Sequence, residues 1–336
     1  MVRNRALLYI ARPEKNIEPT VHLKLSDGEV DLNSVPLNGG VLLKTLCVAS
    51  DPYIRFRMRE PHVPSFCPPI HPGDPVDNSG VGLVLRSEDP KFAAGDYVVG
   101  YLGRRSRAHR GKLPNVPLSI YIRTLGMPGT TAYQGVKYFA SEKLKTAMFV
   151  SGAGGAVGTF VIEYVKVLAP HVKVIASAGS DDKIAMLKAI GADIVFNYKL
   201  EDTSQVLAAN GPIDIYWDNV AGSTLDAALS NLKTEGLVIA CGALSQGRQD
   251  DSSVVKVRHF EEVFKRSLSI HGFSVYNGES AVVVPKFYDE IVPLVVQGKI
   301  TSREHRYNGI DEAAKALADV HARGYIGKPV IVVAEE

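Results

Sequence analysis

The stretch MFVSGAGGAVGTFVIEYVKVLA, residues 148–169, decides the fold of the central part of this 336-residue chain. A short apolar strand enters a glycine-rich turn, and the turn opens a helix with apolar periodicity that stops at Pro170. Gly152, Gly155 and Gly158 lie three residues apart, and their missing Cβ atoms let the turn be tight and let a ligand approach the backbone. A strand, such a turn and a helix in this order are typical of a dinucleotide-binding unit.

Downstream of this turn, apolar strands alternate with stretches of helical periodicity. A second helix is predicted at 181–190, and Gly191 follows it as the C-terminal cap. Alternation of this kind favours an α/β fold with a parallel, doubly wound sheet, a Rossmann domain. Its strands are predicted at 147–151, 172–177, 194–196, 213–217, 237–241 and 268–272.

The first third of the chain has a different texture. Short apolar runs at 41–48, 81–85 and 97–101 are separated by clusters of Gly, Pro, Asn and Asp, which is typical of a barrel or a sandwich-like sheet. The segment from about residue 300 ends in an apolar strand at 329–334 and is too short to be a domain alone. We therefore expect residues 1–123 and 300–336 to form one domain and residues 124–299 to form the Rossmann domain.

The overall charge excludes strong electrostatic attraction to nucleic acid or to an anionic membrane. Lys and Arg number 38 and Asp and Glu number 36, so the net charge is only +2. One segment, 103–112, is dense in Arg, and we expect a solvated surface loop there; contact with an acidic substrate or partner is the alternative. No apolar stretch approaches the length of a membrane span.

Cysteine usage indicates a reduced compartment. The three cysteines are far apart and form no CxxC motif, and a chain of this length needs no disulfide for stability. We therefore expect a cytoplasmic protein.

The nucleotide site has features that favour NADPH over NADH. The N-terminus of the helix after the turn, with Gly152, Gly155, Ala156, Val157 and Gly158, offers backbone N–H groups to a pyrophosphate. An NAD site places Asp or Glu at the end of the second strand, but here that strand ends in ASAGS, residues 176–180.

A neutral loop next to a cation suits the 2′-phosphate of NADPH. Ser180 and Lys183 supply these features. The alternative is that Ser180 only caps the next helix and that Lys183 is only a solvated helix residue, and the two roles can coexist.

The sequence gives little sign of metal or nucleophile chemistry. Only Cys47 lies in a plausible region for a zinc ligand, and His71 is followed by Pro and Gly, which is typical of a turn. Cys67 has no activating base nearby in sequence, and no nucleophile elbow is present. We expect no metal site.

Several motifs together resemble the zinc-independent medium-chain reductases, and most closely their prostaglandin/leukotriene reductases and plant alkenal double-bond reductases. The resemblance extends over most of the chain, and the set is specific where any single motif is not. The matching segments are DPYIRFRM at 51–58, TLGMPGTTAY at 124–133, GAGGAVG at 152–158, GSDDK at 179–183, FNYK at 196–199, DNVAG at 218–222, CGALS at 241–245, GFSVY at 272–276 and GKPVIVV at 327–333.

The resemblance implies a GroES-like β-barrel domain joined to the Rossmann domain, and a homodimer. It also implies roles for individual positions. Tyr53 lies in the substrate pocket and donates a hydrogen bond to a carbonyl oxygen, although without the resemblance a packing role is the simpler interpretation. The implied cofactor contacts are Lys183 with the 2′-phosphate, Tyr198 near the adenosine half, Asn219, Cys241 and Ser245 along the path to the nicotinamide, and Phe273 and Tyr276 around its ring.

The activity implied by the resemblance is conjugate reduction of a small enal or enone. NADPH gives hydride to the β-carbon, and Tyr53 and a cofactor ribose hydroxyl stabilise the enolate oxygen. The α-carbon is then protonated by the tyrosine or by solvent. Two departures affect the detail: Phe264 stands where several relatives have Tyr, and Tyr325 stands where members commonly have Asn. The alternatives are a quinone or carbonyl reductase, and a non-enzymatic structural or RNA-binding relative.

Overall fold

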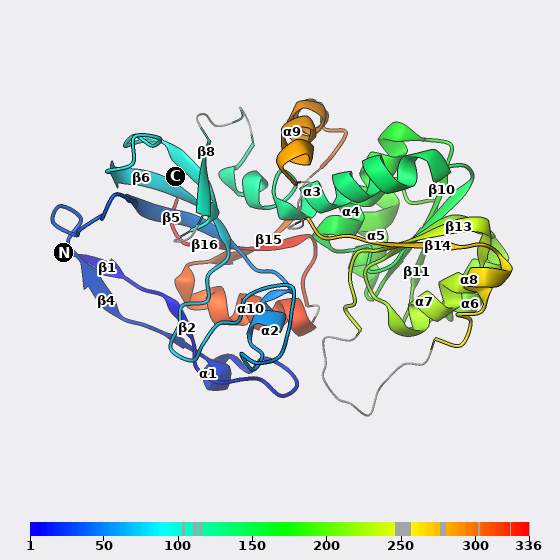
Figure 1. The fold of residues 1–336 in the computed structure, drawn as a ribbon, viewed down its shortest axis with the longest axis horizontal. Helices are drawn as coiled ribbons and strands as arrows, with labels where there is room; N and C mark the ends of the chain where they lie inside the picture. Colours follow the sequence, from blue (N-terminus) through cyan, green and yellow to red (C-terminus); the bar gives the residue numbers. More distant parts are fainter. Residues whose placement is uncertain are drawn as a thin grey trace. The chain divides into compact units, whose positions relative to one another are not determined.

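The computed structural model describes residues 1–102, 105–109, 113, 116–245, 257–275, 280–301, 303–322 and 324–335. Internal contacts divide the chain into two units, one formed by Met1–Arg123 with Glu304–Glu336 and the other by Thr124–Arg303. Each unit contains a six-stranded sheet (Figure 1).

The second unit contains a parallel sheet in the order β11-β10-β9-β12-β13-β14. This is the Rossmann order 3-2-1-4-5-6, and it confirms the predicted fold class. Every residue of β9 and β12 is buried, as expected for strands covered by helices on each side. The strands are β9 (Ala147–Val150), β10 (Lys173–Ala178), β11 (Ile194–Asn197), β12 (Ile213–Asp218), β13 (Leu232–Ala240) and β14 (Ser269–Gly272).

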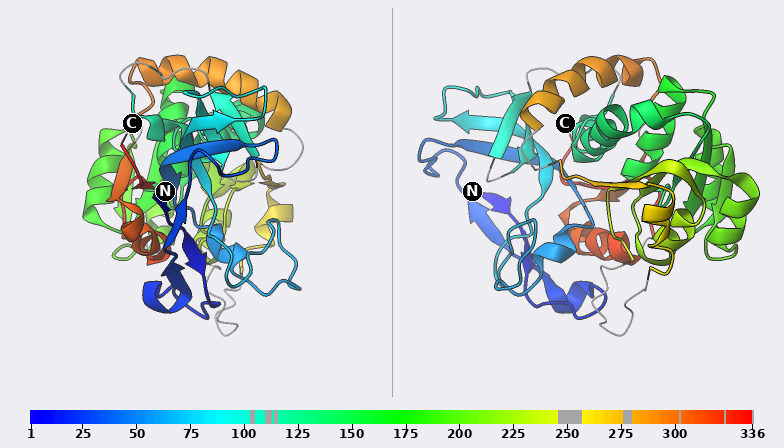
Figure 2. Two further views of the ribbon diagram at one scale, coloured as in Figure 1. Left: turned by 90° about the vertical axis from the view of Figure 1, so that its left-hand side faces the viewer. Right: turned by 45° about the vertical axis from the view of Figure 1, so that its right-hand side comes forward.

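Helices cover this sheet in separate layers (Figure 1). α3 packs against α4 and α9 on one face, and α6 packs against α7 on the other. α9 is the orange helix of Figure 2. The helices are α3 (Met127–Gln134), α4 (Ala156–Leu168), α5 (Asp181–Ala189), α6 (Thr203–Asn210), α7 (Gly222–Leu229), α8 (Glu262–Lys265) and α9 (Ser280–Val296).

The first unit contains a largely antiparallel sheet in the order β15-β16-β5-β6-β7-β8. The C-terminal strand β16 pairs with β5, so the end of the chain returns to the sheet built by its beginning. Two two-stranded ladders, β1–β4 and β2–β3, complete it. The strands are β1 (Val2–Asn4), β2 (Leu7–Tyr9), β3 (Leu23–Leu25), β4 (Gly28–Val30), β5 (Val41–Ala49), β6 (Ser79–Ser87), β7 (Tyr97–Tyr101), β8 (Arg105–His109), β15 (Glu304–Asn308) and β16 (Lys328–Val332).

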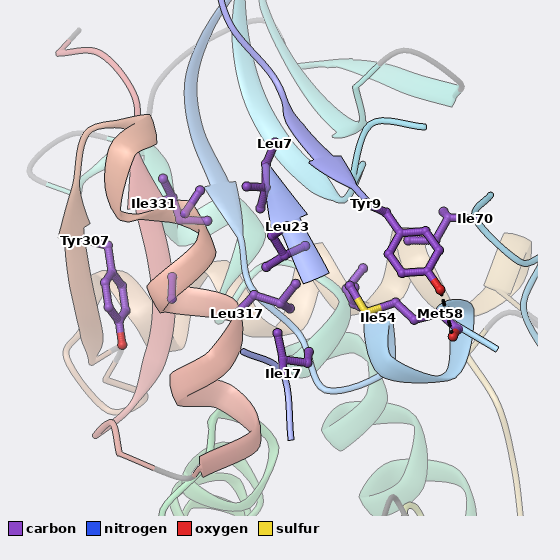
Figure 3. Close-up of a cluster of buried hydrophobic side chains, with 12 residues drawn as sticks. Leu7, Tyr9, Ile17, Leu23, Ile54, Met58, Ile70, Tyr307, Leu317 and Ile331 are labelled. Carbon is purple, nitrogen blue, oxygen red and sulfur yellow. Dashed lines mark hydrogen bonds between the residues drawn. The ribbon is translucent and has the colours of Figure 1, made fainter. Parts of the chain in front are cut away.

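A buried apolar cluster joins short elements of the first unit (Figure 3). Leu7 and Leu23 from the β2–β3 ladder share this cluster with Leu317 from α10 (Ala313–Ala322). Ile54 and Met58 enter it from the one-turn helix α2 (Ile54–Arg57) and its C-cap. A helix of one turn is not stable alone, so this packing is what fixes α2 and the residue before it.

One expectation about this unit was wrong. The Arg-rich segment 103–112 was expected to be a surface loop, but Arg105–His109 forms β8, antiparallel to β7. Charged side chains are common on edge strands, where they oppose pairing with another chain, so a high Arg content does not exclude a strand.

None of the described helices is long and apolar enough to cross a bilayer.

Candidate functional site

The residues predicted to bind a cofactor follow the carboxyl ends of the six parallel strands. β9 and β12 are neighbours where the strand order reverses, which is where open α/β sheets bind ligands. Tyr276 lies outside the described residues. The others are Gly152, Gly155, Ala156, Val157 and Gly158 after β9, Ser180 and Lys183 after β10, Tyr198 after β11, Asn219 after β12, Cys241 and Ser245 after β13, and Phe273 after β14.

The glycines of the turn after β9 serve different purposes. Gly152 has φ +56°, a conformation that side chains disfavour. A Cβ on Gly158 would lie 2.6 Å from Cα of Ala153, so only glycine lets α4 pack on the turn. Gly155 is the N-cap of α4 and has φ −91°. A Cβ there would meet only the carbonyl oxygen of Gly152, at an ordinary 3.6 Å.

The protein itself therefore does not require glycine at position 155. The space next to it lies at the N-terminus of α4, where the first N–H groups have no intrahelical partner. A pyrophosphate that approaches the backbone accounts for this glycine, so the turn fits a dinucleotide.

Lys183 lies across this turn. A Cβ on Gly154 would lie 2.9 Å from Cδ of Lys183, so the absent side chain at 154 makes room for the lysine stem. Lys183 is in the first turn of α5. This position brings a lysine from the second βα unit against the glycine-rich turn of the first.

Residues that follow a third strand, β11, lie against the loop after β10. A Cβ on Gly179 would lie 2.8 Å from the hydroxyl oxygen of Tyr198 and 3.1 Å from Cε of Lys199. Ser180 is the N-cap of α5, and its side chain makes no capping hydrogen bond. The hydroxyl of Tyr198 and the stem of Lys199 therefore lie against this neutral loop.

A buried carboxylate shapes the loop after β12. Asp218 Oδ1 accepts hydrogen bonds from Tyr216 (2.7 Å) and from the N–H groups of Val220 (2.8 Å) and Ala221 (2.7 Å). Burial raises the pKa of Asp218, and these donors oppose that shift. Ala221 has φ +63° and ψ −157°, so the carboxylate holds a non-glycine residue in a conformation that costs about 1–3 kcal/mol.

Hydrogen bonds of Asn219 and Val220 join the loop after β12 to the loops after β9 and β13. Asn219 Nδ2 donates to the carbonyl oxygen of Ser151 (2.8 Å), and its Oδ1 accepts from Trp217 Nε1 (3.2 Å). The Ser245 hydroxyl donates to the carbonyl oxygen of Val220 (2.6 Å). The structure thus brings together Asn219 and Ser245, which the sequence placed on one path.

Cys241 and Phe273 complete the row of predicted positions. The N–H of Cys241 donates to the carbonyl oxygen of Asp218 (2.9 Å), and burial raises the pKa of its thiol to about 12. The thiol is therefore neutral and is not a nucleophile near neutral pH. The ring of Phe273 stands edge-on to Trp217, with centroids 6.2 Å apart.

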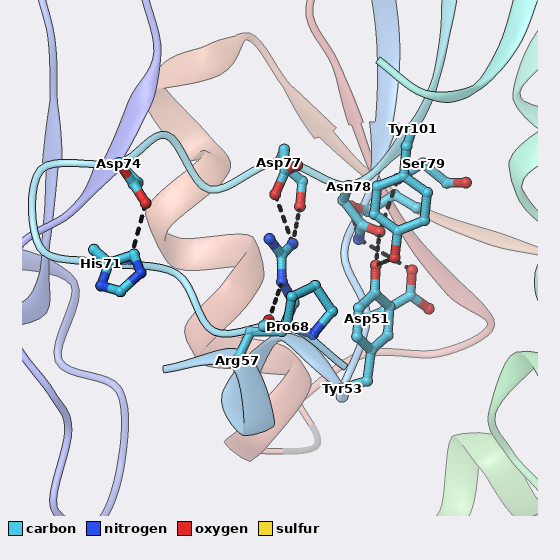
Figure 4. A network of polar contacts seen from close by, with 11 residues as sticks. Asp51, Tyr53, Arg57, Pro68, His71, Asp74, Asp77, Asn78, Ser79 and Tyr101 are labelled. Carbon is cyan, nitrogen blue, oxygen red and sulfur yellow. Dashed lines mark hydrogen bonds and ion pairs between the residues drawn. The ribbon is translucent and has the colours of Figure 1, made fainter. Parts of the chain in front are cut away.

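In the first unit, Tyr53 takes part in a polar network (Figure 4). Its hydroxyl donates to Asn78 Oδ1 (2.5 Å) and also forms a hydrogen bond with the hydroxyl of Tyr101. Asn78 comes directly before β6, and Ser79 is paired with Tyr101 at the end of β7. Strand register therefore places these side chains together.

Two ion pairs hold the elements around this network. Arg57 of α2 contacts Asp77 Oδ1 (2.6 Å), which ties α2 to the segment before β6. Lys328 of β16 pairs with Asp51 and donates to the carbonyl oxygen of Ser50 (2.8 Å). All but Asp77 are less than 9% exposed, so these contacts are shielded from solvent and salt.

The described residues show no group of three or more His, Cys, Asp or Glu side chains arranged to hold a metal ion. Cys47 is buried in β5, and Cys67 is a free thiol. The backbone N–H of His71 donates to Asp74 Oδ2 (2.9 Å), which closes the turn that the sequence indicated (Figure 4).

Several residues of these sites were missed by sequence reasoning. Lys199 directly follows Tyr198, so its position beside the same loop could have been inferred. Asn78 and Tyr101 gave no local signal, because their role depends on the pairing of two strands. Phe264 on α8 is 75% exposed, so a side chain at this position lies on the surface of its unit.

Comparison with known proteins agrees with this geometry. A family model described as a zinc-binding dehydrogenase matches residues 156–293, and one described as the N-terminal domain of an oxidoreductase matches residues 10–112. The chain is 36% identical to the NADP(+)-dependent 2-alkenal reductase of Nicotiana tabacum, over 96% of this chain and 92% of that protein. It is 32% identical to prostaglandin reductase 1 of Mus musculus, over 91% and 94%.

A solved structure shows the same fold. CurA of Vibrio vulnificus in complex with NADPH superimposes with a TM-score of 0.88 at 26% identity, and the match covers 99% of this chain and all of that one. Together with the relatives above, this similarity identifies the chain as a member of the medium-chain dehydrogenase/reductase family, in the group that contains the 2-alkenal and prostaglandin reductases.

Proposed function

We propose that this protein is an NADPH-dependent oxidoreductase that reduces the C=C bond of α,β-unsaturated aldehydes and ketones. The observation that carries the proposal is the near full-length similarity to a 2-alkenal reductase, joined to a Gly155 that the protein's own packing does not require. A further support is that the described residues expected to bind the cofactor follow the carboxyl ends of the parallel strands, where open α/β sheets bind dinucleotides.

The second unit is proposed as the NADPH-binding domain. The N–H groups at the start of α4 bind the pyrophosphate, and Ser180, Lys183 and Tyr198 bind the 2′-phosphate and adenosine half. The path to the nicotinamide is proposed to be lined by Asn219, Cys241, Ser245 and Phe273, together with Tyr276, which is outside the described residues. When bound, NADPH supplies the hydride that is added to the β-carbon.

The first unit is proposed as the substrate domain, and Tyr53 as its catalytic residue. As hydride reaches the β-carbon, negative charge develops on the carbonyl oxygen, and a hydrogen bond from Tyr53 stabilises it. A proton from Tyr53 or from solvent is then added to the α-carbon, which gives the saturated carbonyl product. Removal of one such donor typically costs about 10²–10³ in rate. Phe264 has no hydroxyl, so it supplies no hydrogen-bond donor for this step. The thiol of Cys241 is neutral, so it supplies no charge.

The decisive experiment follows NADPH oxidation with a panel of enals, enones, quinones and simple aldehydes, and identifies each product by mass and NMR. We expect a saturated carbonyl product from the enals and enones. Alcohols as the main products would replace the proposal with carbonyl reduction, and turnover of quinones alone would replace it with quinone reduction. NADPH binding without turnover of any of these substrates would favour a non-enzymatic role.

We further propose that the protein is a cytoplasmic homodimer. The three described cysteines form no disulfide, which suits a reducing compartment. β14 pairs with β13 and forms one edge of the described Rossmann sheet. Ile270 on β14 is 43% exposed, and an exposed apolar edge strand favours pairing with a second copy.

A further inference from the structure

The polar network around Tyr53 fixes the direction of each hydrogen bond. Asn78 Nδ2 donates to the carbonyl oxygen of Ala49 (2.8 Å) and to Asp51 Oδ2 (3.1 Å), and its Oδ1 accepts from the N–H of Ser79 (2.8 Å). A flipped amide would face a donor with its NH₂ group and two acceptors with its oxygen. The amide therefore has one orientation, with Oδ1 toward Tyr53.

Asp51 strengthens this constraint. Its other carboxylate oxygen pairs with the ammonium of Lys328, so the ionised carboxylate acts only as an acceptor toward Asn78. Asn78, Asp51 and Lys328 are at most 5% exposed, and water does not compete freely for these bonds. The buried ion pair of Asp51 and Lys328 therefore fixes the orientation of the Asn78 amide.

The single proton of the Tyr53 hydroxyl determines which group donates each of its hydrogen bonds. A phenol has one proton, and Tyr53 directs it to Asn78 Oδ1, which cannot donate. The hydrogen bond between the two phenols must then run from Tyr101 to the oxygen of Tyr53. A substrate carbonyl receives the Tyr53 proton only when that hydroxyl turns away from Asn78, and during this turn the bond from Tyr101 is kept.

We propose that Tyr101 and Asn78 are positioning residues for Tyr53: Asn78 holds the Tyr53 proton in the resting site, and Tyr101 donates to the Tyr53 oxygen and makes Tyr53 a stronger donor to a substrate carbonyl. Chained hydrogen bonds polarise one another, so the bond from Tyr101 strengthens as charge moves onto the Tyr53 oxygen. The proposal rests on the proposed role of Tyr53 in carbonyl binding.

A double-mutant cycle tests this. Wild type, Tyr53→Phe, Tyr101→Phe and the double variant are assayed with a linear trans-2-alkenal. Loss of the Tyr101 hydroxyl should lower kcat roughly tenfold, with the KM for NADPH unchanged, since one hydrogen bond contributes about that factor. In the Tyr53→Phe background, the same loss should change kcat by less than about twofold, because the hydroxyl has no oxygen left to act on.

A matched control is Tyr97→Phe, the same chemical change four residues earlier on β7, where Tyr97 is paired with Leu83. This variant should behave as wild type. An equal loss from Tyr101→Phe in both backgrounds, or no loss in either, would overturn the proposal. If Tyr53→Phe itself retains full activity, the proposed catalytic role of Tyr53 fails instead.

A second measurement does not need turnover. Tyrosine labelled with ¹³C at Cζ gives NMR signals for the 14 tyrosines, and the signal of Tyr53 is the one missing from Tyr53→Phe. Removing the Tyr101 hydroxyl should move the titration of this signal to higher pH, because the phenolate of Tyr53 loses a donor. An unchanged titration would contradict the proposal even if the protein reduces no alkenal.

Discussion

At the scale of single residues, the space at Gly154 explains how Lys183 reaches the phosphate-binding turn. We expect Lys183→Ala to raise the KM for NADPH about 10–100-fold, because a charge-assisted hydrogen bond contributes about 1.5–3 kcal/mol. The KM for NADH should change little, since NADH has no 2′-phosphate. Initial rates with both cofactors measure this.

Lys188→Ala is the control, because Lys188 lies exposed in the last turn of the same helix. Equal losses with NADPH and NADH would assign Lys183 to the pyrophosphate instead of the 2′-phosphate. Lys199 lies against Gly179 and is the second cation of this region. If Lys199→Ala gives the selective loss and Lys183→Ala does not, the 2′-phosphate contact belongs to Lys199.

At the scale of elements, the buried carboxylate of Glu163 on α4 binds the segment that contains Thr301. Glu163 accepts hydrogen bonds from the N–H (3.1 Å) and the hydroxyl of Thr301, beside the end of this unit. Burial raises the pKa of Glu163 from 4.5 to about 7, and these hydrogen bonds oppose the shift. The folded state therefore binds the Glu163 proton more tightly than the unfolded state does.

This shift predicts a pH dependence of stability. The contribution is fully present below the unfolded pKa near 4.5 and is lost as the pH rises through about 7, on the order of 3 kcal/mol in all. Glu163→Gln should lack this loss, so the difference in unfolding free energy between the two proteins should change between pH 5 and pH 8.5. Urea unfolding followed by fluorescence of Trp217, the single tryptophan and buried in the same unit, measures it.

The difference in unfolding free energy between wild type and Glu163→Gln does not contain the contributions of other titrating groups. His321, for example, is buried, and its pKa is lowered to about 4, so its effect on stability runs in the opposite direction, with stability lost at low pH. Because both proteins contain His321, its contribution cancels. A constant difference across the pH range would show that Glu163 titrates alike in the folded and unfolded states.

The elements of the Rossmann unit could be predicted because their signals are local. A continuous apolar run marks β9, mostly apolar runs mark β10 and β12, and the glycine turn marks the start of α4. β13 begins five residues earlier than predicted, at Leu232 and not Leu237, because its first part carries the polar residues Lys233 to Glu235. β8 was missed for a similar reason, since strand pairing and not apolar composition defines it.

The nucleotide side of the candidate site and the network at Tyr53 also differ in how far the sequence predicts them. On the nucleotide side, one motif and the end of the second strand indicated the glycine turn, Ser180 and Lys183, and the resemblance to the medium-chain reductases supplied the other positions. The network at Tyr53 depends on the register between β6 and β7 and on Lys328, which is far away in sequence. No local pattern contains that information.

At the scale of the whole molecule, the edge of the Rossmann sheet bears on assembly. β14 has three exposed residues of four, and Ile270 is the large apolar one. Monomeric proteins protect such edges with charge, proline or a covering element. Phe260 and Phe264, which precede this strand, are 61% and 75% exposed. These residues add apolar surface to the segment that leads into the edge strand.

Sedimentation velocity should therefore give a dimer of the 36.3 kDa chain, and Ile270→Lys should convert it to monomer by placing a charge in the paired edge. Leu200→Lys is the matched control, because Leu200 is 78% exposed and follows β11 at the opposite edge of the same sheet. A dimer that survives Ile270→Lys but not Leu200→Lys would move the interface to the β11 edge. A monomeric wild type would mean that β14 remains a free edge, and turnover would then belong to the single chain.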